Sequence, residues 1–293
     1  MKNWFGCGWL SILMLACTLD DPTPHDRVCL VTDIVRYRQD SALPKESSRQ
    51  SIRYQGGLLS GYQESNAKRN VLFTLSYEGG MVSRARSADG SQVLALKYDK
   101  NDRIEKASFL INDQEQSIFS LYYNDNNDRR ARLIRLVESR VTLPGNSFIS
   151  SRTFQFEHGT IGNNTQDVVA QTLQIGFRDG TRSQERLTFQ QDPNRHSAFY
   201  DTSQPIVLVL LALTNPTEML PARFLQRFGS QSMLRRVLDI DGSTLLNESS
   251  TFTTEVDGNF NPTQTTELSR TYAPNESGVA RTYGHTFQYD CRE

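Results

Sequence analysis

The feature that most constrains this chain is a loose repeat, in which an alternating apolar run ends at an aromatic residue and meets a turn rich in Gly, Asn and Asp. Alternation with a period of two places apolar side chains on one face of a strand, and these turn residues accept the backbone angles of tight hairpins. Tyr54, Tyr77, Tyr98 and Tyr123 end four such runs, 21 to 25 residues apart. We therefore predict a mainly β chain, an extended meander of antiparallel hairpins forming one large curved sheet or open barrel.

The repeated tyrosines have two interpretations. In the run at 94–99, Leu94 and Tyr98 share one strand face and Lys97 lies on the other, which favours a core stripe of tyrosines. Alternatively the four tyrosines form a ligand-stacking platform, which requires their rings to lie open on a concave face.

The strand pattern is interrupted at residues 203–229. Pro205 precedes eight consecutive apolar residues that end before Asn215 and Pro216, which predicts a buried helix too short to span a bilayer. Residues 221–228, closed by Gly229, predict a second short helix. We expect this insert to cover an end or a face of the sheet.

Strands resume at 233–240, and a hairpin at 251–268 turns through Asp257, Gly258 and Asn259. The last strand is expected at 281–290. Residues 28–293 are therefore predicted to form a single β-rich domain with the insert at 203–229.

The N-terminus predicts export. Lys2 and a short apolar stretch are typical of a secretory signal peptide, here residues 1–16. The segment Leu13-Met14-Leu15-Ala16-Cys17 resembles a bacterial lipobox, which implies diacylglycerol and palmitate on Cys17 and a proline-containing tether over 17–27. The alternative is ordinary secretion without a lipid.

Two cysteines remain when Cys7 and Cys17 are set aside. Cys29 and Cys291 lie near opposite ends of the mature chain, and the exported environment permits disulfides. A bridge would restrict the unfolded chain by about 5–6 kcal/mol in the chain-entropy model and would join the first strand to the last. The alternative is two separately buried thiols.

The hairpin Tyr98-Asp99-Lys100-Asn101-Asp102-Arg103-Ile104 is similar to the Tyr-Asp repeat, with Asp102 at the position of the usual Gly. The layout also resembles a family of uncharacterised Bacteroidota cell-surface lipoproteins with degenerate Tyr-Asp-like hairpin repeats, through the lipobox, the 257–263 turn and the Tyr289-Asp290-Cys291 ending. This resemblance implies an outer-membrane location and a β fold, and no activity. Asp20 and Asp21 resemble an acidic export signal, which leaves the cell surface and the periplasmic face both open.

The sequence gives little sign of chemistry. Lys and Arg total 32 against 33 Asp and Glu, a balance that provides no field for nucleic acid. No nucleophile elbow or phosphate-binding glycine loop occurs, so we expect no enzyme and no cofactor. The acidic clusters at 99–102 and 125–128 are expected to form turns, with Ca²⁺ binding as the alternative. The four histidines, which lack metal-ligand spacing, are expected in the tether, a hairpin turn, a loop and a strand: His25, His158, His196 and His285.

We therefore expect an exported envelope lipoprotein, a non-catalytic binding or structural module for a glycan or an envelope-protein partner. Two other classes remain. One is a polysaccharide hydrolase that uses two unidentified carboxylates. The other is a lipid-binding half-barrel with an apolar cavity beside the predicted helix at 205–213.

Overall fold

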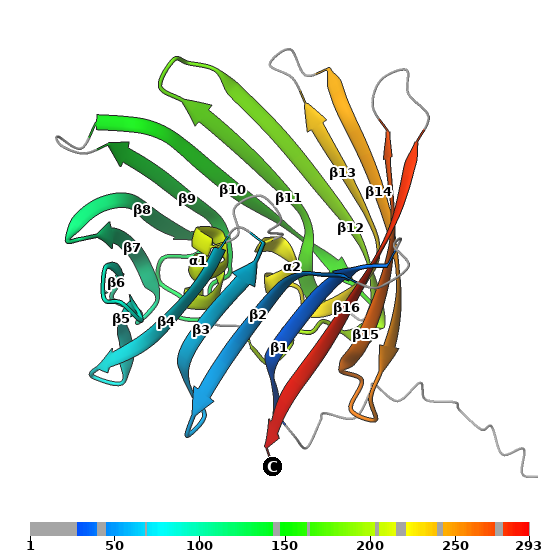
Figure 1. Ribbon diagram of the computed structural model, residues 1–293, viewed down its shortest axis with the longest axis horizontal. Helices are drawn as coiled ribbons and strands as arrows, with labels where there is room; N and C mark the ends of the chain where they lie inside the picture. The colour runs from blue at the N-terminus through cyan, green and yellow to red at the C-terminus, as the bar shows by residue number, and fades with distance from the viewer. Residues whose placement is uncertain are drawn as a thin grey trace, which may run out of the picture.

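The protein is a closed antiparallel β-barrel with two helices inside its ring of strands (Figure 1). The computed structural model describes residues 28–39, 45–67, 69–142, 147–162, 165–202, 205–214, 221–238, 243–272 and 278–292. The predictions for the signal peptide, Cys17 and the tether lie outside these residues. The mainly β meander is confirmed, and of the two sheet forms expected the structure adopts the barrel, in closed form.

Each strand pairs with its sequence neighbours, and the last pairs with the first. The sixteen strands of the described residues are β1 (Val28–Arg38), β2 (Lys45–Gln55), β3 (Leu58–Asn66), β4 (Arg69–Glu78), β5 (Met81–Ser87), β6 (Gln92–Tyr98), β7 (Ile104–Ile111), β8 (Gln114–Tyr123), β9 (Leu133–Thr142), β10 (Ser147–Ile161), β11 (Thr165–Phe177), β12 (Arg182–His196), β13 (Phe228–Leu238), β14 (Thr244–Val256), β15 (Pro262–Tyr272) and β16 (Val279–Arg292).

The barrel closes at the seam between β1 and β16. Cys29 lies opposite Cys291 in this register, and the two form a disulfide. A bulge between Val31 and Asp33 shifts the pairing before the seam continues to Arg38 opposite Tyr283. The predicted bridge and the predicted pairing of the first and last strands are both confirmed.

The alternation along each strand separates the lumen from the outside. On β4, Phe73 and Leu75 are buried, whereas Thr74 and Ser76 are exposed. The same pattern holds on β6, where Leu94 is buried and Lys97 is exposed, as the sequence predicted. Apolar side chains therefore point into the barrel over much of its circumference.

The two helices occupy the lumen. They are α1 (Pro205–Thr214) and α2 (Pro221–Leu225), both within the predicted insert. α1 is buried on all sides from Ile206 to Ala212, which explains why its sequence is apolar throughout. No helix in the described parts of the chain is long and apolar enough to cross a membrane.

One expectation about the insert was wrong, and another was met in an unexpected form. The second helix ends at Leu225, and Phe228 and Gly229 begin β13 instead of closing a helix. The insert lies inside the barrel (Figure 1), so it covers the inner face of the sheet and not an end, and this face is enclosed by the ring of strands, which was not expected. A closed barrel of this size leaves space that its own side chains cannot fill, so the apolar insert is buried there.

Three hairpins share one turn geometry. The backbone bonds Asp99 N–Arg103 O and Asp102 N–Asp99 O have counterparts at 177–181 and 257–261. The fourth residue of each turn has a positive φ: 58° at Asp102, 87° at Gly180 and 61° at Phe260. Asp102 therefore adopts the conformation that Gly supplies in the usual Tyr-Asp motif.

We predict that Cys29→Ser and Cys291→Ser each lower the free energy of unfolding by about 2–5 kcal/mol, the usual loss for a native disulfide. The double variant should be no less stable than the single variants, because all three lack the same covalent link. Denaturant unfolding under oxidising conditions measures these changes, and reduction of the wild type should reproduce them. A double variant that loses the sum of both single effects would contradict this prediction.

Candidate functional site

The two sides of the lumen differ. Toward β3–β10, α1 packs against fully buried wall residues such as Tyr62, Phe119 and Phe154. Toward β12–β16, β1 and β2, a cavity of about 490 Å³ remains beside the helices. The helical insert thus fills one side of the barrel and forms one wall of the cavity on the other.

Arginines from the barrel wall hold the C-terminal end of α1. Arg69 donates to the carbonyls of Leu213 and Thr214, at 3.0 and 2.7 Å. Arg152 donates to the carbonyl of Ala212 at 2.9 Å and forms a buried ion pair with Glu138. These bonds satisfy carbonyls that a helix end leaves without partners, and their positive charge suits the helix dipole. The insert is therefore fixed in place.

One polar network in the cavity wall centres on Arg235 of β13. Its guanidinium contacts Glu185 of β12 at 2.7 Å and Glu248 of β14 at 3.1 Å. Ser269 of β15 donates to the other oxygen of Glu248 at 2.6 Å. Both glutamates are thereby paired and bound to neighbouring strands.

A second network centres on Glu267 of β15. Its Oε2 lies 3.1 Å from Nε2 of His285 and 3.8 Å from the Arg36 guanidinium, and its Oε1 accepts from Ser250 at 2.9 Å. Burial alone would raise the pKa of Glu267, but the hydrogen bond from His285 and the nearby cations lower it to about 2. Burial lowers the pKa of His285, so its imidazole is neutral at pH 7 and donates to Glu267.

A second concavity, of about 940 Å³, lies beside the start of α1 and is lined in part by Tyr77, Tyr98 and Tyr123. Each hydroxyl donates to a backbone carbonyl of the preceding strand: Leu59, Val82 and Ile104, at 2.6, 2.9 and 3.0 Å. The rings also pack against the apolar core. Their contacts are those of a core stripe, and the proposed platform role stays a prediction.

Tyr54 lies apart from this row. Its ring packs against the core, but it borders a shallow depression near the β2–β3 turn, not the concavity of the other three tyrosines. Burial raises the pKa of Tyr54 to about 12, as it does that of Tyr123.

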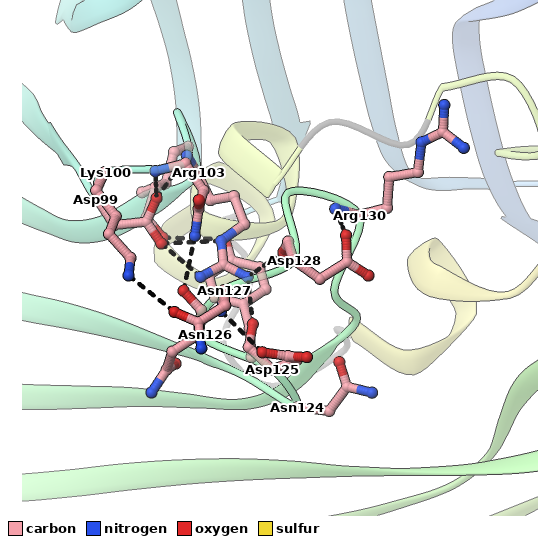
Figure 2. A network of polar contacts seen from close by, with 12 residues as sticks. Asp99, Lys100, Arg103, Asn124, Asp125, Asn126, Asn127, Asp128 and Arg130 are labelled. Carbon is pink, nitrogen blue, oxygen red and sulfur yellow. Dashed lines mark hydrogen bonds and ion pairs between the residues drawn. The ribbon is translucent and has the colours of Figure 1, made fainter.

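The acidic clusters form a polar network (Figure 2), and Asp102 of the first cluster and the adjacent Arg103 line the concavity of about 940 Å³. Asp99 bonds the Arg103 guanidinium at 2.7 and 2.8 Å, and Arg103 donates in turn to the carbonyls of Asp125 and Asp128. Lys100 reaches Asn127 at 2.8 Å. The clusters therefore tie the β6–β7 turn to the β8–β9 loop, which is the turn-forming role expected of them.

The histidines are dispersed. His158 lies on β10, not in a hairpin turn, because a bulge between Glu157 and His158 kinks the strand without ending it. His196 ends β12 and stacks on Tyr200 at 3.9 Å. His285 is on β16, in a strand as expected, and His25 lies outside the described residues. No group of three His, Cys, Asp or Glu residues in the described ranges is placed to hold a metal ion.

Sequence reasoning missed the charged cavity residues. Thr265, Glu267 and Ser269 alternate along β15 on its lumen face, so the polar side of this strand is the buried one. The available signal was the polar residues at every second position of β15, opposite a face that is also mostly polar. Period-two alternation alone does not say which face is inside.

We predict that acid destabilises the wild type more than Glu267→Gln. The pKa of Glu267 is lower in the folded state, about 2, than its ordinary value, so its contribution to stability is present above pH 4.5 and is lost as pH falls toward 2. Between pH 5 and pH 3 the wild type should lose about 2 kcal/mol more unfolding free energy than the variant. Urea unfolding at both pH values measures this, and parallel losses would contradict the pairing.

The comparisons with known proteins support the barrel. No protein-family model matches the sequence, and no curated protein does. Among the solved structures similar to it are a porin-like protein from Bacteroides uniformis, with a TM-score of 0.54 and 13% identity, and one from Bacteroides vulgatus, with a TM-score of 0.51 and 10% identity. Each match covers 89% of this chain. The matches cover 96% of the Bacteroides uniformis protein and 99% of the Bacteroides vulgatus protein. At this identity the likeness establishes the fold, a barrel shared over nearly the whole length of those proteins.

Proposed function

We propose that this chain is an exported outer-membrane lipoprotein, anchored through Cys17, whose barrel binds a glycan or another small molecule in its lumen without transforming it. The observation that carries the proposal is the cavity of about 490 Å³ between the fixed helical insert and the wall of β12–β16, β1 and β2. Its volume falls in the range typical of small-molecule sites.

The side chains on the outer face support the proposal that the barrel is surrounded by water. Barrels that span a membrane carry an apolar outer band and a polar interior. This barrel has packed apolar residues over much of its interior and charged side chains outside. The exposed charges include eight on seven different strands: Arg53, Arg84, Arg86, Lys97, Glu105, Arg135, Arg236 and Arg270. The lipid on Cys17 would then supply the membrane attachment.

The envelope location rests on the N-terminal pattern and on the source of the similar folds. Both similar structures are porin-like proteins from Bacteroides, and the sequence resembles a Bacteroidota lipoprotein family. A polypeptide does not fit a cavity of this size, so the lumen favours a small molecule or one end of a glycan over an envelope protein. The proposal applies to a barrel that faces the cell surface and equally to one that faces the periplasm.

The cavity chemistry favours binding over hydrolysis. A glycosidase needs a carboxylic acid whose pKa is raised so that it can donate a proton. The pKa of Glu267 is shifted the other way, and Glu185 and Glu248 are both paired with Arg235. The lipid-binding half-barrel gains little support from α1, because Val207, Leu208 and Leu210 are fully buried against packed side chains.

We predict that Gln50→Trp blocks the lumen site. Gln50 lines the cavity from β2, and an indole there fills space without removing a hydrogen bond seen among the described residues. Residues 28–293 should bind the neutral fluorophore N-phenyl-1-naphthylamine with saturation, and the variant should lose that binding at unchanged melting temperature. Gln63→Trp, which alters the outer face of β3 and removes two exposed hydrogen bonds, to Arg53 and Asn70, is the control. Equal binding by all three proteins would place the site elsewhere.

The same three proteins should be compared on a glycan array. Glycans retained by the wild type and the control but lost by Gln50→Trp would identify the natural ligand class. An array on which none of the proteins binds above background would contradict a glycan ligand.

The anchor is tested separately. In bacterial cells labelled with palmitate, the wild type should carry label and Cys17→Ser should carry none and remain an unprocessed precursor. Cys7→Ser is the matched control, because Cys7 precedes the predicted cleavage site and should leave labelling unchanged. Equal labelling of wild type and Cys17→Ser would contradict the lipoprotein assignment.

A further inference from the structure

The cavity contains a cation without a protein partner. Arg223 of α2 lines the cavity, and its guanidinium lies over the Phe252 ring at 4.8 Å. No hydrogen bond or ion pair joins this guanidinium to another residue in the described part of the chain. Burial lowers the pKa of Arg223, which reflects the cost of holding its charge away from water. Its side chain is only partly exposed and its charge has no ion-pair partner among the described residues, so this arginine is a candidate for a ligand contact.

The nearby carboxylate is already engaged. Glu267 accepts from Ser250 at one oxygen and faces His285 and Arg36 at the other. Arg36 itself stacks on the Tyr283 ring at 4.1 Å, and its charge opposes that of Arg223. Glu267 attracts Arg223 more strongly than Arg36 repels it, but it forms no ion pair with Arg223, so it offsets the charge of this guanidinium only in part.

The lining of the cavity as a whole carries a net positive charge. Five arginines line it, Arg36, Arg195, Arg223, Arg235 and Arg281, against three glutamates, Glu185, Glu248 and Glu267. Arg235 is shared by Glu185 and Glu248, and Arg195 bonds Asp192 at 2.7 Å. With Asp192 included, five arginines face four carboxylates, which leaves one net positive charge, and Arg223 and the exposed Arg281 are the two arginines without an ion-pair partner among the described residues.

Aromatic rings lie in the same cavity wall. Phe199 and Phe224 contact each other with ring centres 4.9 Å apart, and Phe287 of β16 lines the cavity as well. Phe224 is the residue after Arg223 on α2 and is almost fully buried. The cavity therefore combines a cation that lacks an anion with surfaces that suit an apolar or aromatic body.

We propose that the lumen cavity binds an organic anion, with its carboxylate or phosphate oxygens on Arg223 and its apolar body against the aromatic wall. This inference rests on the proposed lumen binding and names its ligand class. Guanidinium groups bind both oxyanions through charge-assisted hydrogen bonds, so Arg223 contributes to affinity and selects for charge.

The test compares two fluorophores that differ by one charged group, 8-anilinonaphthalene-1-sulfonate and N-phenyl-1-naphthylamine. Residues 28–293, which contain every described helix and strand, should bind the sulfonate about tenfold more tightly than the neutral compound, as one charge-assisted contact provides. Arg223→Gln should remove this preference and keep the neutral binding. Arg84→Gln, on the outer face of β5, is the control of equal charge change and should retain it.

The outcomes separate the two proposals. Equal wild-type affinity for both fluorophores, or a preference that persists in Arg223→Gln, would overturn the anion site while lumen binding stands. Failure of the neutral fluorophore to bind the wild type would instead count against lumen binding itself. Melting temperatures of the variants are measured by near-ultraviolet circular dichroism. Unchanged values show that a lost preference for the sulfonate does not result from unfolding.

Competition then identifies the head group. Octanoate and octyl phosphate carry the two oxyanions on the same apolar chain, and the stronger competitor for the bound sulfonate names the preferred one. Displacement should be weaker in Arg223→Gln than in the wild type. If neither compound displaces the sulfonate from the wild type, the proposed ligand class is wrong.

Discussion

A barrel of this circumference is too wide for its wall side chains to meet across the lumen, and the rest of the structure depends on how that space is filled. The chain fills it with α1, a helix that is apolar on every side. Such a helix is stable only if it is surrounded, and burial of each large apolar side chain contributes about 1.5–3 kcal/mol. The barrel and the insert therefore stabilise each other.

An apolar helix in a lumen also brings its polar ends with it. The carbonyls of the last turn of α1 lack partners within the helix, and they accept hydrogen bonds from Arg69 on β4 and Arg152 on β10. Arg152 is in turn buried with Glu138, so a charge network stands where a simple core would be expected. Removing one member of such a network costs more than the pair contributes, because it leaves the other charge unpaired. The position of the helix is thus specified by polar contacts, and its burial by apolar ones.

Local features of this structure could be read from the sequence, whereas the contents of the lumen could not. Few residues decide the turn at Asp257 and the start of α1 at Pro205. The pairing of Cys29 with Cys291 follows once the other two cysteines are set aside. The location of the insert depends on closure, which is a property of all strands together. The strand through His158 was misjudged because Glu157, His158 and Gly159 have turn-like composition, although a bulge lets pairing continue. The Glu267 and Arg223 environments join residues far apart in the chain, which no local pattern reports.

The seam between β1 and β16 has a consequence for the order in which the barrel forms. β1 pairs with β2 on one side, but its other edge is satisfied only by the final strand of the chain. Until that strand has been synthesised, β1 presents open backbone groups that invite pairing with other chains. Closure is therefore the last and most non-local step of folding, and contacts of such long range form slowly. The interval before it is the period in which this protein is most exposed to aggregation.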